Sequence, residues 1–145
     1  MTESLKAAVL LDRTIVAVSG PDRVKFLQGL MTNDIRRLAP DKALYAGFLT
    51  GQGKLICDAF VLMDGDRILI DIATALVEDF VKRLTAFKLR AAVEIGETAP
   101  ALAVTVVWGP GAMEFVQYNR GVAISVIWSR RIGRECCCCG DHHRR

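Results

Sequence analysis

The hydrophobic and polar positions between Leu44 and Ile72 predict three short strands joined by two tight turns. Runs of apolar and β-branched residues are interrupted at Gly51-Gln52-Gly53 and again at Asp64-Gly65-Asp66. Glycine adopts a positive φ without a steric penalty, so both interruptions favour chain reversals between antiparallel strands. We expect the rest of the fold to be organised around these three strands.

The middle strand of the three is apolar on both of its faces, because successive side chains of a strand point to opposite sides. One face carries Leu55, Cys57, Ala59, Val61 and Met63, and the other carries Ile56, Asp58, Phe60 and Leu62. A strand of this kind is typical of a sheet that is covered on both sides. Asp58 is therefore expected where a carboxylate is costly unless a hydrogen bond or a ligand compensates it. This makes Asp58 the leading candidate for a functional residue.

The remaining pattern predicts further strands and two helices. One helix begins at Ser19-Gly20-Pro21-Asp22, where proline suits the first helical position, and ends near Met31. A second helix, from Thr74 to Leu89, has a clear apolar stripe. The strands predicted outside the centre are Leu5–Leu11, Thr14–Val18, Ala91–Ile95, Ala101–Trp108 and, less regular, Gly121–Trp128. The pattern as a whole predicts an α+β fold, with a mostly antiparallel sheet and packed helices.

Composition indicates a globular chain whose charge excess lies at one end. Hydrophobic residues make up 52% of the 145 residues, and the net charge is +3. Residues 129–145 hold five arginines against Glu135 and Asp141, so this segment carries the whole excess and the rest is neutral. Neutrality argues against nucleic acid or a membrane surface as a partner. No apolar run approaches about 20 residues and the N-terminus lacks the layout of a signal peptide, so we expect a cytoplasmic protein.

The end of the chain differs in character from the rest. The regular pattern weakens after Trp108, and we predict a domain over residues 1–108 followed by an atypical tail over residues 109–145. The tail contains Cys136, Cys137, Cys138, Cys139, His142 and His143. One hypothesis is a metal- or thiol-binding protein that acts through these side chains. Adjacent cysteines converge poorly on one tetrahedral ion, however, so we predict no metal site and favour an out-of-frame or foreign tail.

Several motifs, in order and at natural spacing over about residues 5 to 108, resemble the YgfZ-type folate-binding proteins of the aminomethyltransferase (GcvT) superfamily. The motifs are Leu11-Asp12-Arg13, Val18-Ser19-Gly20-Pro21-Asp22, Phe26-Leu27-Gln28-Gly29-Leu30-Met31-Thr32-Asn33-Asp34, Tyr45 to Leu49, Gly51-Gln52-Gly53-Lys54, Asp58, Lys88-Leu89-Arg90 and Val93. The resemblance implies the N-terminal lobe of the aminomethyltransferase fold. The most specific motif of these proteins, Lys-Gly-Cys-Tyr-x-Gly-Gln-Glu, is absent from this sequence.

The resemblance also implies a function. Such proteins bind tetrahydrofolate and support the maturation or repair of iron–sulfur enzymes, and through them tRNA modification. The expected partners are therefore a folate and iron–sulfur proteins or their assembly factors. The expected folate-binding residues are Asp58, Asn33, Met31 and Thr32, and no residue is assigned a catalytic role. The alternative is an aminomethyltransferase of glycine cleavage, which resembles this chain but carries two adjacent aspartates where this sequence has Cys57-Asp58.

Structural explanations compete with these functional ones. Asp58 is equally explained as a carboxylate tied to a backbone N–H or an arginine. Residues 28–34 are equally explained by capping at a helix end, because asparagine and aspartate favour such positions. Tyr45 is expected in the core and Lys54 in a solvated turn. Cys57 is expected to be a small buried apolar residue, since no histidine lies in the body of the chain to activate it as a nucleophile.

Overall fold

The computed structural model describes residues 4–40, 42–97, 102–118 and 124–127. In chain order the elements are β1 (Lys6–Val9), β2 (Arg13–Ser19), α1 (Arg23–Gln28), the 3-10 turn η1 (Ile35–Arg37), β3 (Leu44–Leu49), β4 (Leu55–Asp64), β5 (Arg67–Ala73), the 3-10 turn η2 (Thr74–Leu76), α2 (Val77–Lys88), β6 (Glu94–Glu97), β7 (Val104–Trp108), α3 (Ala112–Tyr118) and β8 (Ile124–Ile127). Of the tail predicted over residues 109–145, residues 119–123 and 128–145, which include the cysteine run, lie outside the described residues.

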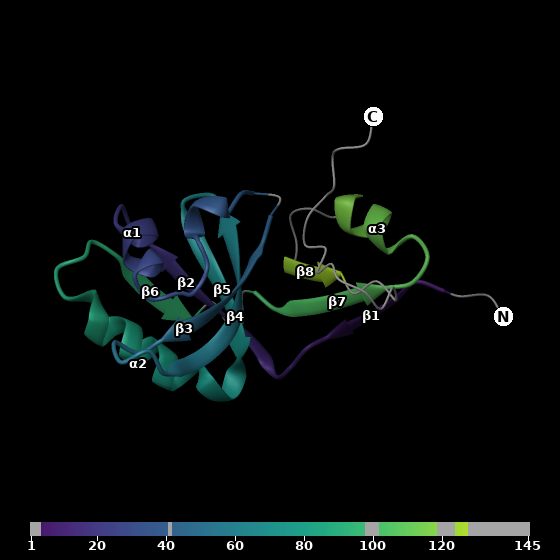
Figure 1. The fold of residues 1–145 in the computed structure, drawn as a ribbon. Helices are drawn as coiled ribbons and strands as arrows, with labels where there is room; N and C mark the ends of the chain where they lie inside the picture. Colours follow the sequence, from purple (N-terminus) through teal and green to yellow (C-terminus); the bar gives the residue numbers. More distant parts are fainter. Residues whose placement is uncertain (1–3, 41, 98–101, 119–123, 128–145) are drawn as a thin grey trace.

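The described strands form two sheets. The larger sheet has the order β3-β4-β5-β2-β6, and every neighbouring pair in it is antiparallel. The smaller sheet has the order β1-β7-β8, with β1 antiparallel and β8 parallel to β7. Figure 1 shows α2 against one side of the larger sheet, with the smaller sheet and α3 on the other. The predicted α+β class with a mostly antiparallel sheet is therefore confirmed.

The three central strands follow the predicted pattern. The first turn closes through hydrogen bonds between Thr50 N and Lys54 O (2.8 Å) and between Gly53 N and Thr50 O (2.9 Å). At the second turn Asp64 pairs with Arg67, and Gly65 has a φ of +59°. Local sequence is sufficient here because a hairpin needs only a turn that reverses the chain and alternating side chains that give it one buried face.

The main core lies between the larger sheet and the two helices. Its buried apolar residues come from α1, β3, β4, β5 and α2, and Phe48 meets Phe80 of α2 edge-on, with ring centroids 5.1 Å apart. On the exposed side of α2 two i,i+4 ion pairs form: Lys82 contacts Glu78 and Arg83 contacts Asp79, each at 2.6 Å. Such exposed pairs contribute only about 0.3–0.5 kcal/mol each, so buried apolar contacts hold α2 in place.

The first helix is shorter than predicted. α1 begins at Arg23 rather than Pro21 and ends at Gln28. The Asp22 carboxylate makes no hydrogen bond to its own helix; it accepts one from Ala92 N at 2.8 Å and so ties the helix start to the chain before β6. Gly20 permits this close approach. Its φ is +102°, and a Cβ atom there would collide with Ala92 O.

The strands predicted over Ala91–Ile95 and Ala101–Trp108 correspond to β6 and β7, which enter different sheets. β6 pairs with β2 of the larger sheet, whereas β7 pairs with β1 and β8. The helix α3 was not predicted, and β8 falls inside the strand expected over 121–128. Periodicity in a single segment carries no information on which distant strand becomes its neighbour, so this division is decided by tertiary packing.

Candidate functional site

Within the described residues, the larger sheet leaves part of one face uncovered. Side chains of β4 alternate between the helix-covered core, which takes Cys57, Ala59 and Val61, and the opposite side. There a second apolar cluster built on Ile15, Leu69 and Val104 covers only the part near β2 and β5. The remaining exposed or half-buried area is called here the Asp58 face, and it comprises Arg13, Tyr45, Gly47, Asp58, Phe60 and Ala73.

Asp58 is exposed, so the expectation that the sheet is covered on both sides at this residue is wrong. The Tyr45 hydroxyl donates a hydrogen bond of 2.6 Å to Asp58 Oδ2. This bond lowers the pKa of Asp58 below its usual value of 3.8 and is the main cause that raises the pKa of Tyr45 above 10.0. The open sheet face therefore presents an ionised carboxylate at neutral pH, oriented by a neutral phenol.

Tyr45 was expected in the core, but it is 56% exposed. Its ring lies beside that of Phe60, with centroids 5.2 Å apart and planes inclined by 49°. The two residues are direct partners in the β3–β4 register. The alternation of side chains along β3 could have predicted that Tyr45 is exposed, because Leu44, Ala46 and Phe48 take the buried positions. The carboxylate of Asp58 thus has aromatic surface next to it, an arrangement that suits a flat ring with N–H donors.

Residues 31–33 run along the outer edge of β3. Met31 forms an isolated bridge with Phe48. Thr32 N donates to Gly47 O, and Gly47 N donates to Thr32 Oγ1, both at 2.9 Å. Asn33 Nδ2 donates to Tyr45 O at 3.0 Å. Because β3 is an edge strand, these bonds satisfy backbone groups that are otherwise open to pairing with another chain.

The four predicted folate-binding residues therefore meet around one short piece of β3. Gly47 is the partner of Asp58 in the register, and Thr32 bonds the opposite edge of the same residue. Met31 is only 7% exposed and its side chain belongs to the main core, so it has a packing role. Thr32 and Asn33 hold β3, and with it Tyr45, in position next to Asp58.

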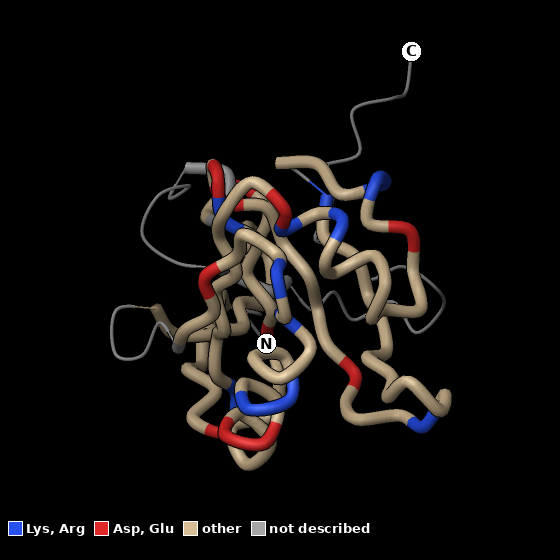
Figure 2. The backbone as a smooth tube through the Cα atoms, turned by 90° about the vertical axis from the view of Figure 1, so that its left-hand side faces the viewer, with Lys and Arg blue, Asp and Glu red and all other residues tan. Residues whose placement is uncertain are grey.

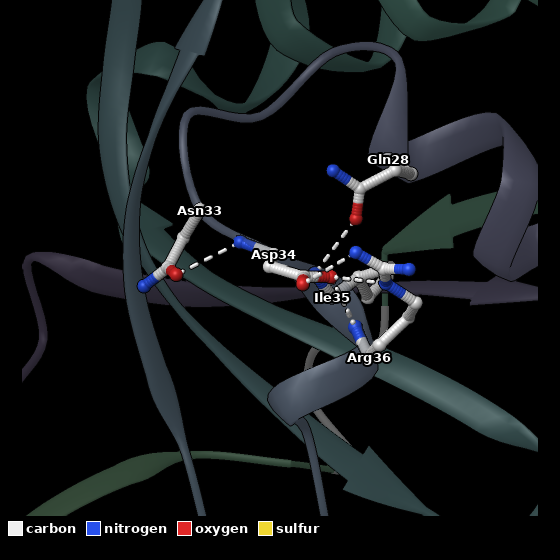
Figure 3. Close-up of polar contacts among 5 residues, drawn as sticks. All are labelled: Gln28, Asn33, Asp34, Ile35 and Arg36. Atoms are coloured by element: carbon white, nitrogen blue, oxygen red, sulfur yellow. Dashed lines mark hydrogen bonds and ion pairs between the residues drawn. The ribbon is translucent and has the colours of Figure 1, made fainter.

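Several polar groups between Gln28 and Arg36 also hydrogen-bond to one another (Figure 3). Asn33 Oδ1 accepts from Asp34 N, and Gln28 Oε1 accepts from Ile35 N, both at 2.8 Å. Asp34 accepts bonds from the backbone and the guanidinium of Arg36, which lower the pKa of Asp34. The capping explanation of this segment is thus observed directly, and a ligand contact by Asn33 stays a prediction.

Cys57 points away from the open face. Its thiol is buried in the core, and burial, with a smaller contribution from the Asp58 charge, raises its pKa to about 11. A thiol with this pKa is neutral at physiological pH and is neither a nucleophile nor a ready metal ligand. The expectation that Cys57 is a buried apolar residue is confirmed.

A buried ion pair on the same sheet face was missed by the sequence analysis. Asp71 is 1% exposed, and Arg13 contacts it twice: Nε to Oδ1 and Nη2 to the backbone oxygen, both at 2.8 Å. Burial raises the pKa of Asp71, against the lowering effect of the Arg13 guanidinium. The sequence did indicate a buried carboxylate at this position, since Asp71 is the one acidic residue within the apolar run 68–72. Asp71, and not Asp58, is the buried carboxylate that needs compensation, and the Arg13 guanidinium supplies it.

Charge and metal chemistry add no further site within the described chain. Figure 2 shows basic and acidic residues interspersed along the backbone. Among the described residues, no group of three or more histidine, cysteine, aspartate and glutamate side chains could hold a metal ion. In the same part of the chain, no helix combines the length and apolar character that a membrane crossing requires.

The fold is that of the N-terminal domain of the aminomethyltransferase type. The crystal structure of the glycine cleavage system aminomethyltransferase T from Bartonella henselae is similar, with a TM-score of 0.67 over 79% of this chain and 31% of that one. The sequence identity is 15%, so this similarity concerns the fold alone. Residues 10–125 match the GCVT N-terminal domain family, and the chain belongs to that family.

Several curated proteins are similar to this chain in sequence. An iron–sulfur cluster assembly factor IBA57 homolog, described as mitochondrial, from Mycosarcoma maydis is 34% identical over 116 residues, covering 71% of this chain and 29% of that protein. A protein described in the same words from Dictyostelium discoideum is 30% identical, covering 64% and 30%. An uncharacterized protein of Aquifex aeolicus (strain VF5) is 34% identical, covering 72% and 69%. The chain thus spans less than a third of the length of the first two relatives.

Proposed function

We propose that this chain is part of a tetrahydrofolate-binding protein that supports the maturation of iron–sulfur enzymes. The observation that carries the proposal is the Tyr45–Asp58 pair on an open face of a GCVT N-terminal domain. The iron–sulfur part rests on the relatives, which are described as iron–sulfur cluster assembly factors. The finer assignment to the YgfZ type, with tRNA modification through client enzymes, rests on the motif resemblance, and a cytoplasmic location stays a prediction.

The residues of the open face fit a reduced pterin. Its pyrimidine ring carries adjacent ring and exocyclic N–H donors, which suit an ionised carboxylate as a paired acceptor. Asp58 supplies that carboxylate, and Phe60 and Tyr45 supply aromatic surface beside it. In this arrangement Asp58 binds and orients the ring, whereas Tyr45 keeps the carboxylate ionised and fixed in direction. When bound, the reduced folate would supply one-carbon chemistry to whatever reaction the larger protein carries out.

Binding of tetrahydrofolate to the chain, measured by calorimetry under anaerobic conditions, tests this proposal. Asp58→Asn is expected to weaken binding by about tenfold or more, because a charged acceptor is replaced by a neutral one. Asp66→Asn is the matched control: it is the same chemical change at an exposed position in the β4–β5 turn, and it should leave the affinity unchanged. Absence of binding, or equal affinities of the two variants, would remove folate from the proposal.

A spectroscopic titration checks the same pair without a ligand. The phenol absorbance of Tyr45, isolated by subtracting the spectrum of Tyr45→Phe, should titrate above pH 10 and shift down in Asp58→Asn, because the neighbouring anion opposes formation of phenolate. An unchanged midpoint would mean that the hydrogen bond does not form in solution.

The iron–sulfur role is testable in a longer chain. Residues 10–125 can replace the matching segment of the Mycosarcoma maydis relative, and iron–sulfur enzyme activity can be measured in cells that lack that relative. We expect the chimaera to restore activity and the Asp58→Asn chimaera to restore less. Activity that is restored equally by both would separate the iron–sulfur role from the open face. The aminomethyltransferase alternative has support from the fold and the family match, but Cys57 stands where those enzymes carry the first of two adjacent aspartates.

A further inference from the structure

The strand register places Arg13 and Asp58 in one row across the open sheet face. Gly47 pairs with Asp58, and Arg13 pairs with Ala73. Phe60 of β4 and Ile15 of β2 both pair with Asp71 of β5, and Asp58 and Arg13 each lie two residues along the chain from these partners. Because side chains alternate along a strand, Asp58 and Arg13 lie on the same face of the sheet, on strands that β5 separates. Two opposite charges face the same side of the sheet, with a small side chain between them.

The guanidinium of Arg13 is held in a fixed direction but is not fully used. It carries five N–H donors, of which Asp71 takes two. No partner for the other three is found among the described residues. The Arg13 side chain keeps 22% of its surface exposed. Its positive charge acts on both Asp58 and Tyr45: it helps to lower the pKa of Asp58 and opposes the rise in the pKa of Tyr45.

The stability of the fold gives only a weak reason for the Arg13–Asp71 ion pair. The desolvation of a buried ion pair commonly cancels its attraction, and an apolar pair of similar volume often serves as well. A planar guanidinium that Asp71 holds through Nε and Nη2 is, in contrast, well suited to bind a carboxylate through its remaining N–H donors. We propose that Arg13 is the anion-binding residue of the Asp58 face, and that it receives a carboxylate of a ligand whose ring N–H donors are held by Asp58. This deepens the proposed function and rests on it for the identity of the ring.

The experiment uses two halves of the folate molecule. p-Aminobenzoyl-glutamate carries carboxylates without a pterin, and tetrahydropterin carries the ring without a carboxylate. The variant is the double substitution Arg13→Gln with Asp71→Asn, which removes the ion pair without leaving a buried unpaired charge. Circular dichroism verifies its fold. Affinities are measured by calorimetry for both halves and for tetrahydrofolate.

We expect the double variant to bind p-aminobenzoyl-glutamate and tetrahydrofolate about tenfold more weakly, and tetrahydropterin within about twofold of the wild type. Asp58→Asn should show the reverse, weakening tetrahydropterin and sparing p-aminobenzoyl-glutamate. Equal binding of p-aminobenzoyl-glutamate to the wild type and the double variant, or no binding to either, overturns the proposal. A parallel loss of both halves in a folded double variant also overturns it, because Arg13 would then act only on structure.

The outcomes separate this proposal from the proposed function. If tetrahydropterin fails to bind the wild type while p-aminobenzoyl-glutamate binds through Arg13, the folate assignment fails and the anion site stands. If the double variant does not fold, Arg13→Lys takes its place, since lysine keeps the charge and lacks the planar fork. That variant should then weaken p-aminobenzoyl-glutamate selectively by about threefold or more, and unchanged binding would overturn the proposal.

Discussion

Replacing Arg13 by methionine should destabilise the protein by an amount that depends on pH. Methionine keeps most of the volume and the apolar stem of arginine but removes both contacts to Asp71. Asp71 is then a carboxylate of 1% exposure without its cation. Breaking a buried pair by removing one partner typically costs about 3–5 kcal/mol, because the remaining charge is uncompensated.

The structure sets a ceiling on the charge part of this cost, because the folded protein can neutralise Asp71 by binding a proton. For a carboxyl with an ordinary pKa of 3.8, protonation costs 1.36 kcal/mol per pH unit above that value. The ceiling is therefore about 4 kcal/mol at pH 7 and about 1.6 kcal/mol at pH 5. With an m-value of about 2 kcal/mol/M, the urea midpoint should fall by about 2 M at pH 7 and by less than about 1 M at pH 5.

The sign follows from the pKa of Asp71, which is raised in the folded protein. The folded state then holds the proton more tightly than the unfolded state, so stability decreases as pH rises from 3.8 through the folded pKa. Loss of Arg13 removes an influence that lowers this pKa and extends the window toward neutral pH. The difference in unfolding free energy between wild type and Arg13→Met should therefore grow between pH 5 and pH 7.

Urea unfolding followed by tryptophan fluorescence at pH 5, 6 and 7 measures this difference. Arg83→Met is the matched control, because Arg83 pairs with Asp79 on the exposed side of α2. That exposed pair is worth about 0.5 kcal/mol or less, so the control should lose little stability at any of the three pH values. A loss for Arg13→Met that is constant with pH, or below about 1 kcal/mol at pH 7, would refute the reasoning about Asp71.

Two further predictions concern the core and the backbone. In a variant whose tail cysteines are replaced by serine, Cys57 should not react with a thiol reagent at pH 8 until the protein is unfolded, because the pKa of its thiol is about 11. Rapid reaction of the folded protein would contradict the burial of Cys57. Gly20→Ala should destabilise by more than about 3 kcal/mol, since strain at positive φ adds to a collision with Ala92 O. Gly65→Ala, with positive φ but open space, should cost only about 1–2 kcal/mol by urea unfolding, and equal losses would contradict the collision.

Local sequence patterns were enough to predict the central hairpins, α2 and the apolar character of the core. The central hairpins follow from glycines at two reversals, and the position of α2 follows from its apolar stripe and i,i+4 charges. The burial of Cys57 followed in the same way from a strand apolar on both faces. These features depend on residues that are neighbours in the chain, where backbone preference and side-chain alternation act directly.

Which carboxylate is buried and which is exposed depends on packing between distant parts of the chain. Asp58 and Asp71 both lie in apolar strands, but the second apolar cluster reaches β5 and stops short of the Asp58 end of β4. The partner of Asp71 is 58 residues away in the chain, and Tyr45 became part of the site because β3 stands at a sheet edge. The extent of a covering layer and the contacts of distant strands are set by packing between whole elements, and that information is absent from the pattern of any single segment.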